Sequence, residues 1–344
     1  MKREEIYNKV SQIRRLLDDL WLLDTVQAAP SAIVLAGEVR VPIPDFEVTA
    51  SGRLLAAGYN GAVIEQAATV TSPWRVMITV PIARAAEGVP WLNIALFCAT
   101  VATTILMGGP AFAFWFLTIL IFHEFGHFIF ARMRDIDASW PYFIPAPNIL
   151  GTFGAFIRLR SPIRDRIGLF DMAVAGPIAG FVIAVIALAV GLAHSSVVPP
   201  TTEGGFYLGE SLLFKLMSWI FFPGVSSDQN ILLHPIAFAG WAGLLVTMFN
   251  LLPMGQLDGG HIAYAIFKKG QRWLALVTMA GLAAVSYWWP WWLMWVAIGL
   301  FMRPEHPPTL HDSTPVGRGR VILGIVALLI FVLCFTPVPF RIEP

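Results

Sequence analysis

Several apolar runs in this chain reach the roughly 20 residues that a helix needs to cross about 30 Å of hydrocarbon. Apolar residues make up 57% of the sequence and charged residues only 13%. A composition of this kind is typical of proteins that cross the membrane several times. We therefore predict an α-helical polytopic membrane protein with about six or seven membrane helices and a small soluble α+β domain at the N-terminus.

The predicted membrane helices are apolar stretches separated by charged or turn-forming segments. They cover residues 89–107, 111–130, 168–193, 235–252, 273–288, 290–302 and 320–336. The fifth and sixth are short and meet at Trp288-Trp-Pro-Trp-Trp292, which favours an interfacial hairpin or a re-entrant pair over two full crossings. Arginines are concentrated between the second and third helices, whereas 194–234 contain Lys215 as their only cation. The positive-inside rule therefore places the first of these two loops in the cytosol.

The N-terminal segment differs from the rest of the chain in its charge. Residues 1–86 hold a large share of all charges, and we predict that they form the soluble α+β domain, with 87–265 as the membrane-embedded core and 266–344 as additional membrane helices. Residues 4–23 have apolar side chains at helical spacing. Predicted strands cover 32–41, 46–50, 62–70 and 74–82. The first 23 residues lack the apolar core of a signal peptide, so we expect a cytosolic N-terminus in a prokaryotic cytoplasmic membrane.

The apolar run over residues 111–122 leads directly into the motif His123-Glu-Phe-Gly-His127. Histidines four residues apart on a helix project from the same face and can bind one Zn²⁺ through their ring nitrogens. Glu124, between them, can act on a water molecule bound to that metal. Because ionisable side chains in a membrane helix are costly unless something pairs with them, metal binding is the most economical explanation of the motif.

A catalytic zinc ion also needs a third protein ligand and an open position for water. The candidate segment begins at Asn250 and ends at His261, where an apolar span breaks at Pro and Gly before the isolated Asp258. Broken backbone at membrane depth is tolerated only when protein or a wet cavity surrounds it. His261 is the alternative third ligand, three residues beyond Asp258. The remaining histidines are expected to be solvated or interfacial and not to bind metal: His194, His234, His306 and His311.

A His-Glu-x-x-His motif in the second span, followed by Asn250-x-x-Pro-x-x-x-Leu-Asp258-Gly in a later span, resembles the site-2 protease family of intramembrane zinc metalloproteases. The glycine-rich runs at 151–157 and 170–180 resemble the subgroup without a PDZ domain that includes chloroplast members. The resemblance implies that His123, His127 and Asp258 bind zinc and that Glu124 is the catalytic base. It further implies hydrolysis of peptide bonds within the membrane.

Two further segments have functional and structural interpretations. The Asn250 amide is a candidate second donor to the developing oxyanion or a clamp on the substrate backbone, and the alternative is an asparagine that satisfies a carbonyl at its own helix end. Residues 151–160 form a β-like run whose edge could pair with an unwound substrate, or a hairpin that only packs against the helices. Gly176, Pro177 and Gly180 are expected to be helix-packing positions.

The expected partners are transmembrane protein substrates and the lipid bilayer. The net charge of +1 and the lack of a dense basic face argue against nucleic acid. Two other functions remain open. A catalytically silent protein that escorts membrane segments would not need Glu124, and a metal-ion transporter would be expected to show repeated halves with matched polar sites.

Overall fold

The computed structural model describes residues 3–28, 32–59, 62–66, 73–81, 89–134, 136–160, 163, 165–199, 205–225, 229–307, 309 and 315–343. The chain divides into two compact units. The first consists of Met1–Val89 and Leu159–Pro162, and the second of Pro90–Arg158 and Ile163–Pro344. The predicted boundary between residues 86 and 87 lies outside the described residues, and the predicted subdivision at 265 stays a prediction.

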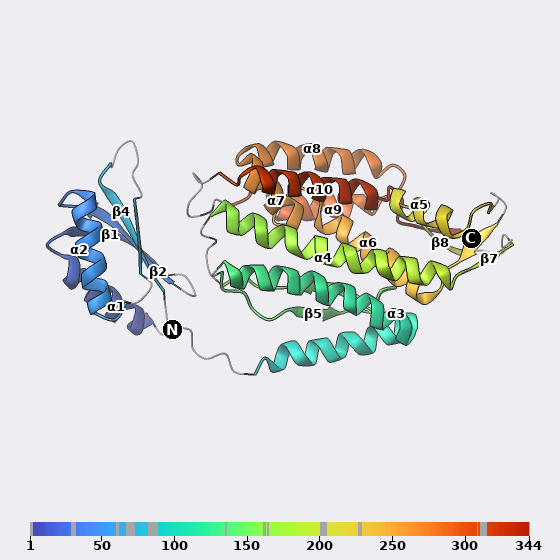
Figure 1. Ribbon diagram of the computed structural model, residues 1–344, viewed down its shortest axis with the longest axis horizontal. Coiled ribbons are helices and arrows are strands. Elements are labelled where there is room, and N and C mark those ends of the chain that lie inside the picture. Colours follow the sequence, from blue (N-terminus) through green and yellow to red (C-terminus); the bar gives the residue numbers. More distant parts are fainter. Residues whose placement is uncertain are drawn as a thin grey trace. The chain divides into compact units, whose positions relative to one another are not determined.

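The first unit is a four-stranded antiparallel sheet covered on one face by two helices (Figure 1). The sheet has the strand order β1-β2-β4-β3. Its elements are α1 (Arg3–Leu17), β1 (Trp21–Ala28), β2 (Ala32–Val39), α2 (Ile43–Ala56), β3 (Val63–Gln66) and β4 (Arg75–Pro81). Alternate strand residues such as Ile33, Leu35 and Ile78 are fully buried together with side chains from both helices. This alternation is what a sheet with one covered face requires.

Two sequence predictions for this unit are wrong. The segment 46–50 was expected to be a strand, but it lies inside α2, where Phe46, Ala50 and Leu54 are buried on one helix face. Pro44 in the first turn suits a helix start, and a short apolar run does not by itself separate strand from helix. The predicted helix 4–23 ends at Leu17, because residues 21–28 instead pair with β2. Of the predicted strand 62–70, residues 67–70 lie outside the described part.

The second unit is a bundle of helices with small two-stranded sheets at its edges. Its helices are α3 (Trp91–Met133), α4 (Arg166–Ala193), α5 (Leu212–Phe221), α6 (Pro235–Asn250), α7 (Asp258–Phe267), α8 (Gly270–Val285), α9 (Trp292–Phe301) and α10 (Arg318–Cys334). Within the described part of the chain, two helices are long and apolar enough to cross a membrane, α3 and α4. The predicted number of about six or seven membrane helices therefore stays a prediction.

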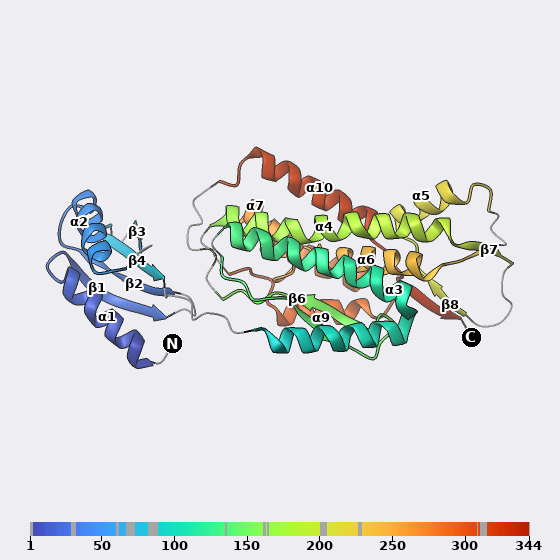
Figure 2. The ribbon, with the colours of Figure 1, turned by 60° about the horizontal axis from the view of Figure 1, so that its bottom comes forward.

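Helix α3 is bent sharply in its middle, so that its two halves run beside each other in both ribbon views (Figures 1 and 2). Gly109 has φ 77° and ψ 172°, and Pro110 follows it. A positive φ suits glycine, and proline cannot continue the hydrogen bonding of the preceding turn. The two halves correspond to the predicted helices 89–107 and 111–130.

The other predicted helices 168–193, 235–252, 273–288, 290–302 and 320–336 correspond to α4, α6, α8, α9 and α10 within a few residues. The short helices α8 and α9 pack against each other as a hairpin. Several short elements were not predicted: α5, α7, β7 (Ser196–Val198), β8 (Gly205–Leu208), β9 (Asn230–Leu232) and β10 (Phe340–Glu343). The strands pair as β7 with β9 and β8 with β10, and strands this short carry little periodic signal.

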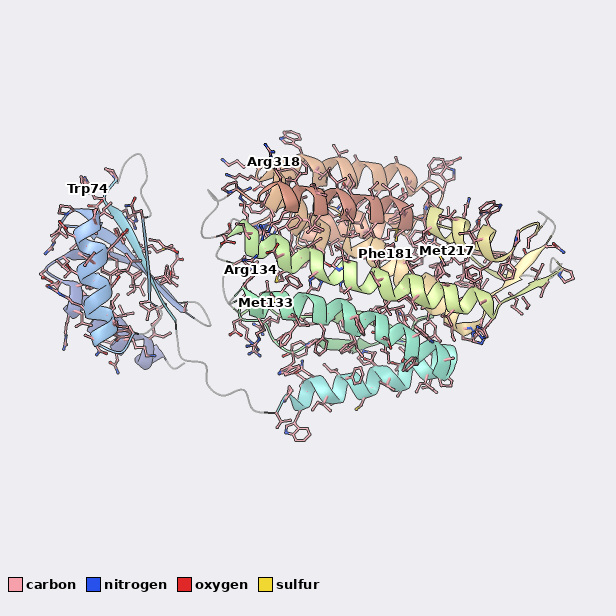
Figure 3. All side chains as sticks on the ribbon, viewed as in Figure 1. Trp74, Met133, Arg134, Phe181, Met217 and Arg318 are labelled. Atoms are coloured by element: carbon pink, nitrogen blue, oxygen red, sulfur yellow. The ribbon has the colours of Figure 1, made fainter. Side chains whose placement is uncertain are left out.

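Basic side chains gather at one end of the bundle. Arg134 at the end of α3 and Arg318 at the start of α10 lie at this end in Figure 3, whereas Met217 of α5 lies toward the other end. Asp171 of α4 forms ion pairs there with Arg134 and with Arg320, whose Nε lies 2.6 Å from the Asp171 Oδ1 atom. We call this group of helix termini the basic end. One shared carboxylate thus ties α3, α4 and α10 together.

Candidate metal centre

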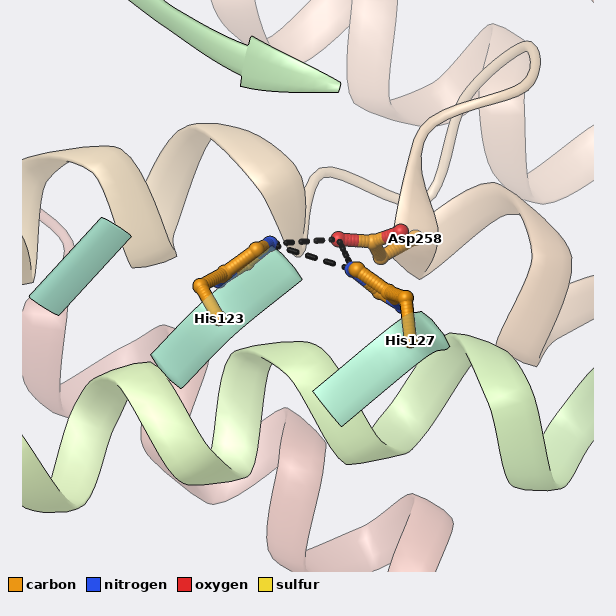
Figure 4. A group of neighbouring side chains, drawn as sticks. All are labelled: His123, His127 and Asp258. Atoms are coloured by element: carbon orange, nitrogen blue, oxygen red, sulfur yellow. Dashed lines mark hydrogen bonds and ion pairs between the residues drawn. The ribbon is translucent and has the colours of Figure 1, made fainter. Parts of the chain in front are cut away.

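The second half of α3 carries both histidines of the His-Glu-x-x-His motif on the face that packs against α4. His123 and His127 are buried, and their ring centroids are 4.8 Å apart. A side chain and its neighbour one helical turn later necessarily project in the same direction. The motif therefore presents two ring nitrogens to the same point inside the bundle (Figure 4).

Asp258 reaches this point because the chain breaks between α6 and α7. Helix α6 ends at Asn250, the next seven residues fold back tightly through Gly255 at φ 55°, and α7 begins at Asp258. A left-handed φ at Gly255 costs little because glycine has no Cβ. The break places Asp258 opposite the two histidines (Figure 4).

Three ligand atoms form a nearly equilateral triangle. The Nε2 atoms of His123 and His127 are 3.1 Å apart, and each lies 3.3 Å from the Asp258 Oδ2 atom. Metal-ligand bonds of about 2.0–2.2 Å in a tetrahedral site place the ligand atoms roughly 3.3–3.6 Å from one another. Among the described residues, His123, His127 and Asp258 form the one group of at least three His, Cys, Asp or Glu side chains that could hold a metal ion. Their spacing fits a zinc ion with three protein ligands.

Glu124 lies beside this triangle without belonging to it. Its side chain is buried, with 4% of the residue exposed, and its Oε2 atom has no hydrogen-bond partner among the described residues. A buried carboxylate oxygen without a partner is costly unless another group or molecule occupies its surroundings. A carboxylate that is held next to the ligand set, and that is not itself a ligand, can accept a proton from water.

A backbone carbonyl fixes the orientation of the His127 ring. The Nδ1 atom of His127 lies 2.8 Å from the carbonyl oxygen of Met172 in α4. Because a carbonyl only accepts hydrogen bonds, Nδ1 carries the proton and the neutral ring presents the lone pair of Nε2 to the triangle. Asp171, the next residue toward the N-terminus, is held by Arg134 and Arg320, so the ion pairs at the basic end also anchor this carbonyl.

Comparison with known proteins places these residues in a family. Peptidase family M50 matches residues 111–286, which include both histidines, Glu124 and Asp258. The chain belongs to Peptidase family M50.

Curated relatives agree with the M50 match. The chain is 37% identical over 242 residues to the Arabidopsis thaliana protein named probable zinc metalloprotease EGY1, chloroplastic. The aligned region covers 66% of this chain and 42% of the relative. The chain is 31% identical over 267 residues to probable zinc metalloprotease EGY2, chloroplastic, of the same plant, covering 74% and 46%. The chain thus spans less than half the length of these relatives. The predicted family is confirmed, and zinc is the metal that their names imply.

Asn250 ends α6 next to the candidate metal centre. Its Nδ2 atom lies 3.2 Å from the Nε2 atom of His123, a residue 127 positions earlier in the chain. Among the described residues the amide therefore contacts a metal-ligand candidate and not a carbonyl at its own helix end. This position suits either of the two roles near the substrate that the sequence suggested.

The remaining histidines of the chain lie away from the ligand triangle. The Nδ1 atom of His261 lies 2.6 Å from the Nε2 atom of His306, so it does not join Asp258 as a ligand. We expect His306 to be solvated or interfacial from the sequence, but it is buried. Its ring stacks on that of Tyr264 with the ring centroids 4.4 Å apart. The residues next to His306 in the sequence are polar, so the sequence did not indicate that its ring is buried. His194 and His234 lie at helix ends as expected, and His311 is outside the described residues.

Glycines of α4 allow the M50 motif helix to pack closely. A Cβ atom at Gly176 would lie 2.5 Å from two carbons of the His127 ring, and one at Gly180 would lie 3.1 Å from the Cβ of His123. Gly126 of α3 in turn faces the backbone of Ala175. The prediction that Gly176 and Gly180 are helix-packing positions is confirmed, and the surface that they pack against carries the two candidate metal-binding histidines.

Substitution Gly176→Ala should displace the His127 ring and reduce zinc retention. The new methyl group would overlap a buried ring, and overpacking of this kind costs about 1–3 kcal/mol. Gly180→Ala should have a smaller effect, because its Cβ would need a shift of only a few tenths of an ångström. Gly281→Ala in α8 is the matched control, since nothing lies within 4 Å of its Cβ position. Zinc content and thermal stability of the three purified variants would test this order, and wild-type zinc content in Gly176→Ala would contradict it.

The β-like run forms a hairpin that packs on the first half of α3. Strands β5 (Tyr142–Pro145) and β6 (Thr152–Phe156) pair with each other, and Phe143 contacts Phe97 with ring centroids 5.0 Å apart. The Thr103 hydroxyl donates a hydrogen bond of 2.6 Å to the carbonyl of Gly151. Packing against a helix, one of the two predicted roles, is therefore present. The outer edge of β6 pairs with no other strand among the described residues.

Proposed function

We propose that this chain is an intramembrane zinc metalloprotease that hydrolyses peptide bonds of transmembrane substrate proteins. The single observation that carries the proposal is the triangle of His123, His127 and Asp258 with edges of 3.1–3.3 Å beside the buried Glu124. Membership of Peptidase family M50 and the names of the relatives support the same chemistry. In this proposal the three residues of the triangle bind zinc, and Glu124 is the general base.

The residues of the site divide the chemical work among them. A zinc ion in such a site activates water at neutral pH and polarises a carbonyl group. The Glu124 carboxylate accepts the proton of the attacking water and later returns it to the leaving amine. The Met172 carbonyl holds the tautomer of His127 that can bind metal. The Asn250 amide, next to His123, donates to the oxyanion or clamps the substrate backbone.

A membrane helix must unwind before it can be cut, because its carbonyls are held in internal hydrogen bonds. The outer edge of β6 pairs with no strand among the described residues, so it can pair with an extended segment by strand addition. We propose that an unwound substrate segment pairs there. The hairpin packs against the first half of α3, and the second half of the same helix carries the His-Glu-x-x-His motif, which supports this assignment.

We also propose that the basic end of the bundle faces the cytosol. The helix termini at this end carry four basic residues: Arg134, Arg166, Lys268 and Arg318. The positive-inside rule predicts such a concentration on the cytosolic side. A cytosolic location of the N-terminal unit stays a prediction. The prediction of a prokaryotic cytoplasmic membrane stays a prediction, and the relatives named above are chloroplast proteins.

The experiment that tests the proposal combines metal analysis with a cleavage assay. The purified chain in detergent should contain about one zinc ion per chain and cleave a fluorescent transmembrane peptide. Removal of the metal with a chelator should stop cleavage, and added zinc should restore it. A segment-binding escort would bind the peptide without cutting it, and a transporter would exchange its ions and carry flux across vesicles. Either result in place of cleavage would contradict the proposal.

A further inference from the structure

A cavity lined by both basic and apolar side chains lies at the basic end, apart from the candidate metal centre. It has a volume of about 730 Å³ and lies between the start of α4, the end of α7 and the start of α10. Arg166, Lys268 and Arg318 each come from one of these helix ends and line it together. We call this cavity the basic pocket. Its volume is in the range that accommodates small ligands.

Two of the cations that line the basic pocket, Lys268 and Arg318, have no neutralising partner within the described part of the chain. No carboxylate is among the described residues that line the pocket. Within the described part of the chain, Lys268 and Arg318 have no ion pair, whereas Arg320, two residues after Arg318, is neutralised by Asp171. Two cations without an ion pair that line one cavity repel each other and create a positive potential there. The basic pocket is therefore suited to an anion.

Backbone features of the basic pocket point the same way. Lys268 has φ 54° and ψ −124°, a conformation that favours glycine, so the lysine at this turn has some backbone strain. Arg166 has only 4% of its surface exposed, and its Nη1 atom donates a hydrogen bond of 2.7 Å to the carbonyl of Ala265. This hydrogen bond holds its guanidinium between α4 and α7. One cation of the pocket is thus fixed inside the bundle.

The basic pocket is also apolar on one side. Ile266, Val321 and Ile322 line it, and Ile322 is 61% exposed at the start of the apolar run of α10. A free inorganic anion gains nothing from contact with apolar side chains, whereas a lipid has a charged headgroup next to its hydrocarbon chains. Basic pockets between membrane helices on the cytosolic side are suited to anionic lipid headgroups.

We propose that the basic pocket binds the phosphate headgroup of an anionic membrane phospholipid, with the acyl chains along Val321 and Ile322 of α10. The proposal rests on the membrane placement of the bundle and not on peptidase activity. A protein that cuts no peptide can therefore still bind the lipid. Bound lipid would link α4, which anchors the Met172 carbonyl, to α7, which begins with Asp258.

Titration of the full chain in neutral detergent with phosphatidylglycerol, followed by native mass spectrometry, tests this assignment. The double variant Lys268→Gln/Arg318→Gln should bind phosphatidylglycerol about 25-fold more weakly, since each cation contributes roughly fivefold. Lys269→Gln is the matched control, because it removes the same charge from the adjacent exposed residue, which does not line the pocket. Zinc content should stay unchanged in every variant.

Lys268→Gly separates lipid binding from folding. Glycine adopts the backbone conformation of residue 268 without strain, so thermal stability should stay the same or rise while affinity for phosphatidylglycerol falls about fivefold. Wild-type affinity in the double variant, or equal affinity for zwitterionic phosphatidylcholine, would overturn the proposal. Displacement of phosphatidylglycerol by an equal concentration of inorganic phosphate would identify a free-anion site and overturn the lipid assignment.

Discussion

Glu124→Gln should abolish peptide-bond cleavage while the protein keeps its zinc. Glutamine has nearly the same shape as glutamate but cannot accept the proton of an attacking water. General-base catalysis contributes about a hundredfold to ten-thousandfold to rate, so cleavage should fall by at least that lower factor. Zinc should stay because Glu124 is not a corner of the ligand triangle. The measurement is the turnover of a transmembrane peptide together with zinc content from elemental analysis.

The fold of this variant should be unaffected. Glu124 is buried with one oxygen lacking a partner among the described residues, so loss of its charge removes a desolvation cost and leaves the side-chain volume unchanged. Glu210→Gln is the matched control, because the same substitution is made there at a half-exposed side chain far along the sequence from the motif. Undiminished turnover by Glu124→Gln at full zinc content would remove the proposed base.

The main helices were predictable because long apolar runs have few alternative structures. Helices α4 and α6 follow directly from such runs, and Gly109-Pro110 marks the bend of α3 in the sequence. The segment 46–50 was misassigned because five residues with alternating apolar side chains suit a strand as well as one face of a helix. Its position in α2 depends on packing of Phe46 against the sheet, which local sequence does not encode.

The sequence indicated those parts of the candidate site that consist of distinctive side chains. It did not indicate the parts that consist of backbone groups. Two histidines and an aspartate with metal-ligand properties stand out against apolar surroundings, and the break before Asp258 indicates where the chain can turn inward. The Met172 carbonyl has no such signature, because every residue has one. Asp171 could have been noticed as an isolated acid near the start of an apolar helix. The burial of His306 depends on Tyr264, a contact across 42 positions in the chain.

Asp258→Ala should cause the largest loss of zinc. The substitution leaves two imidazoles from one helix, and a zinc site normally has at least three protein ligands. Loss of an outer partner of a metal ligand already weakens binding by about tenfold to a hundredfold, so loss of the ligand itself should exceed a hundredfold. Competition with a chromophoric chelator would measure this change in affinity for the purified chain.

Asp258→Cys distinguishes a metal ligand from a residue that only supports the fold. A thiolate at this position can bind zinc, so this variant should recover much of the affinity that Asp258→Ala loses. A purely structural aspartate would give equal losses in both variants. His261→Gln is the control for the alternative third ligand, and it should keep its zinc because His261 contacts His306 and not the triangle. Zinc retained by Asp258→Ala but lost by His261→Gln would transfer the role of third ligand to His261.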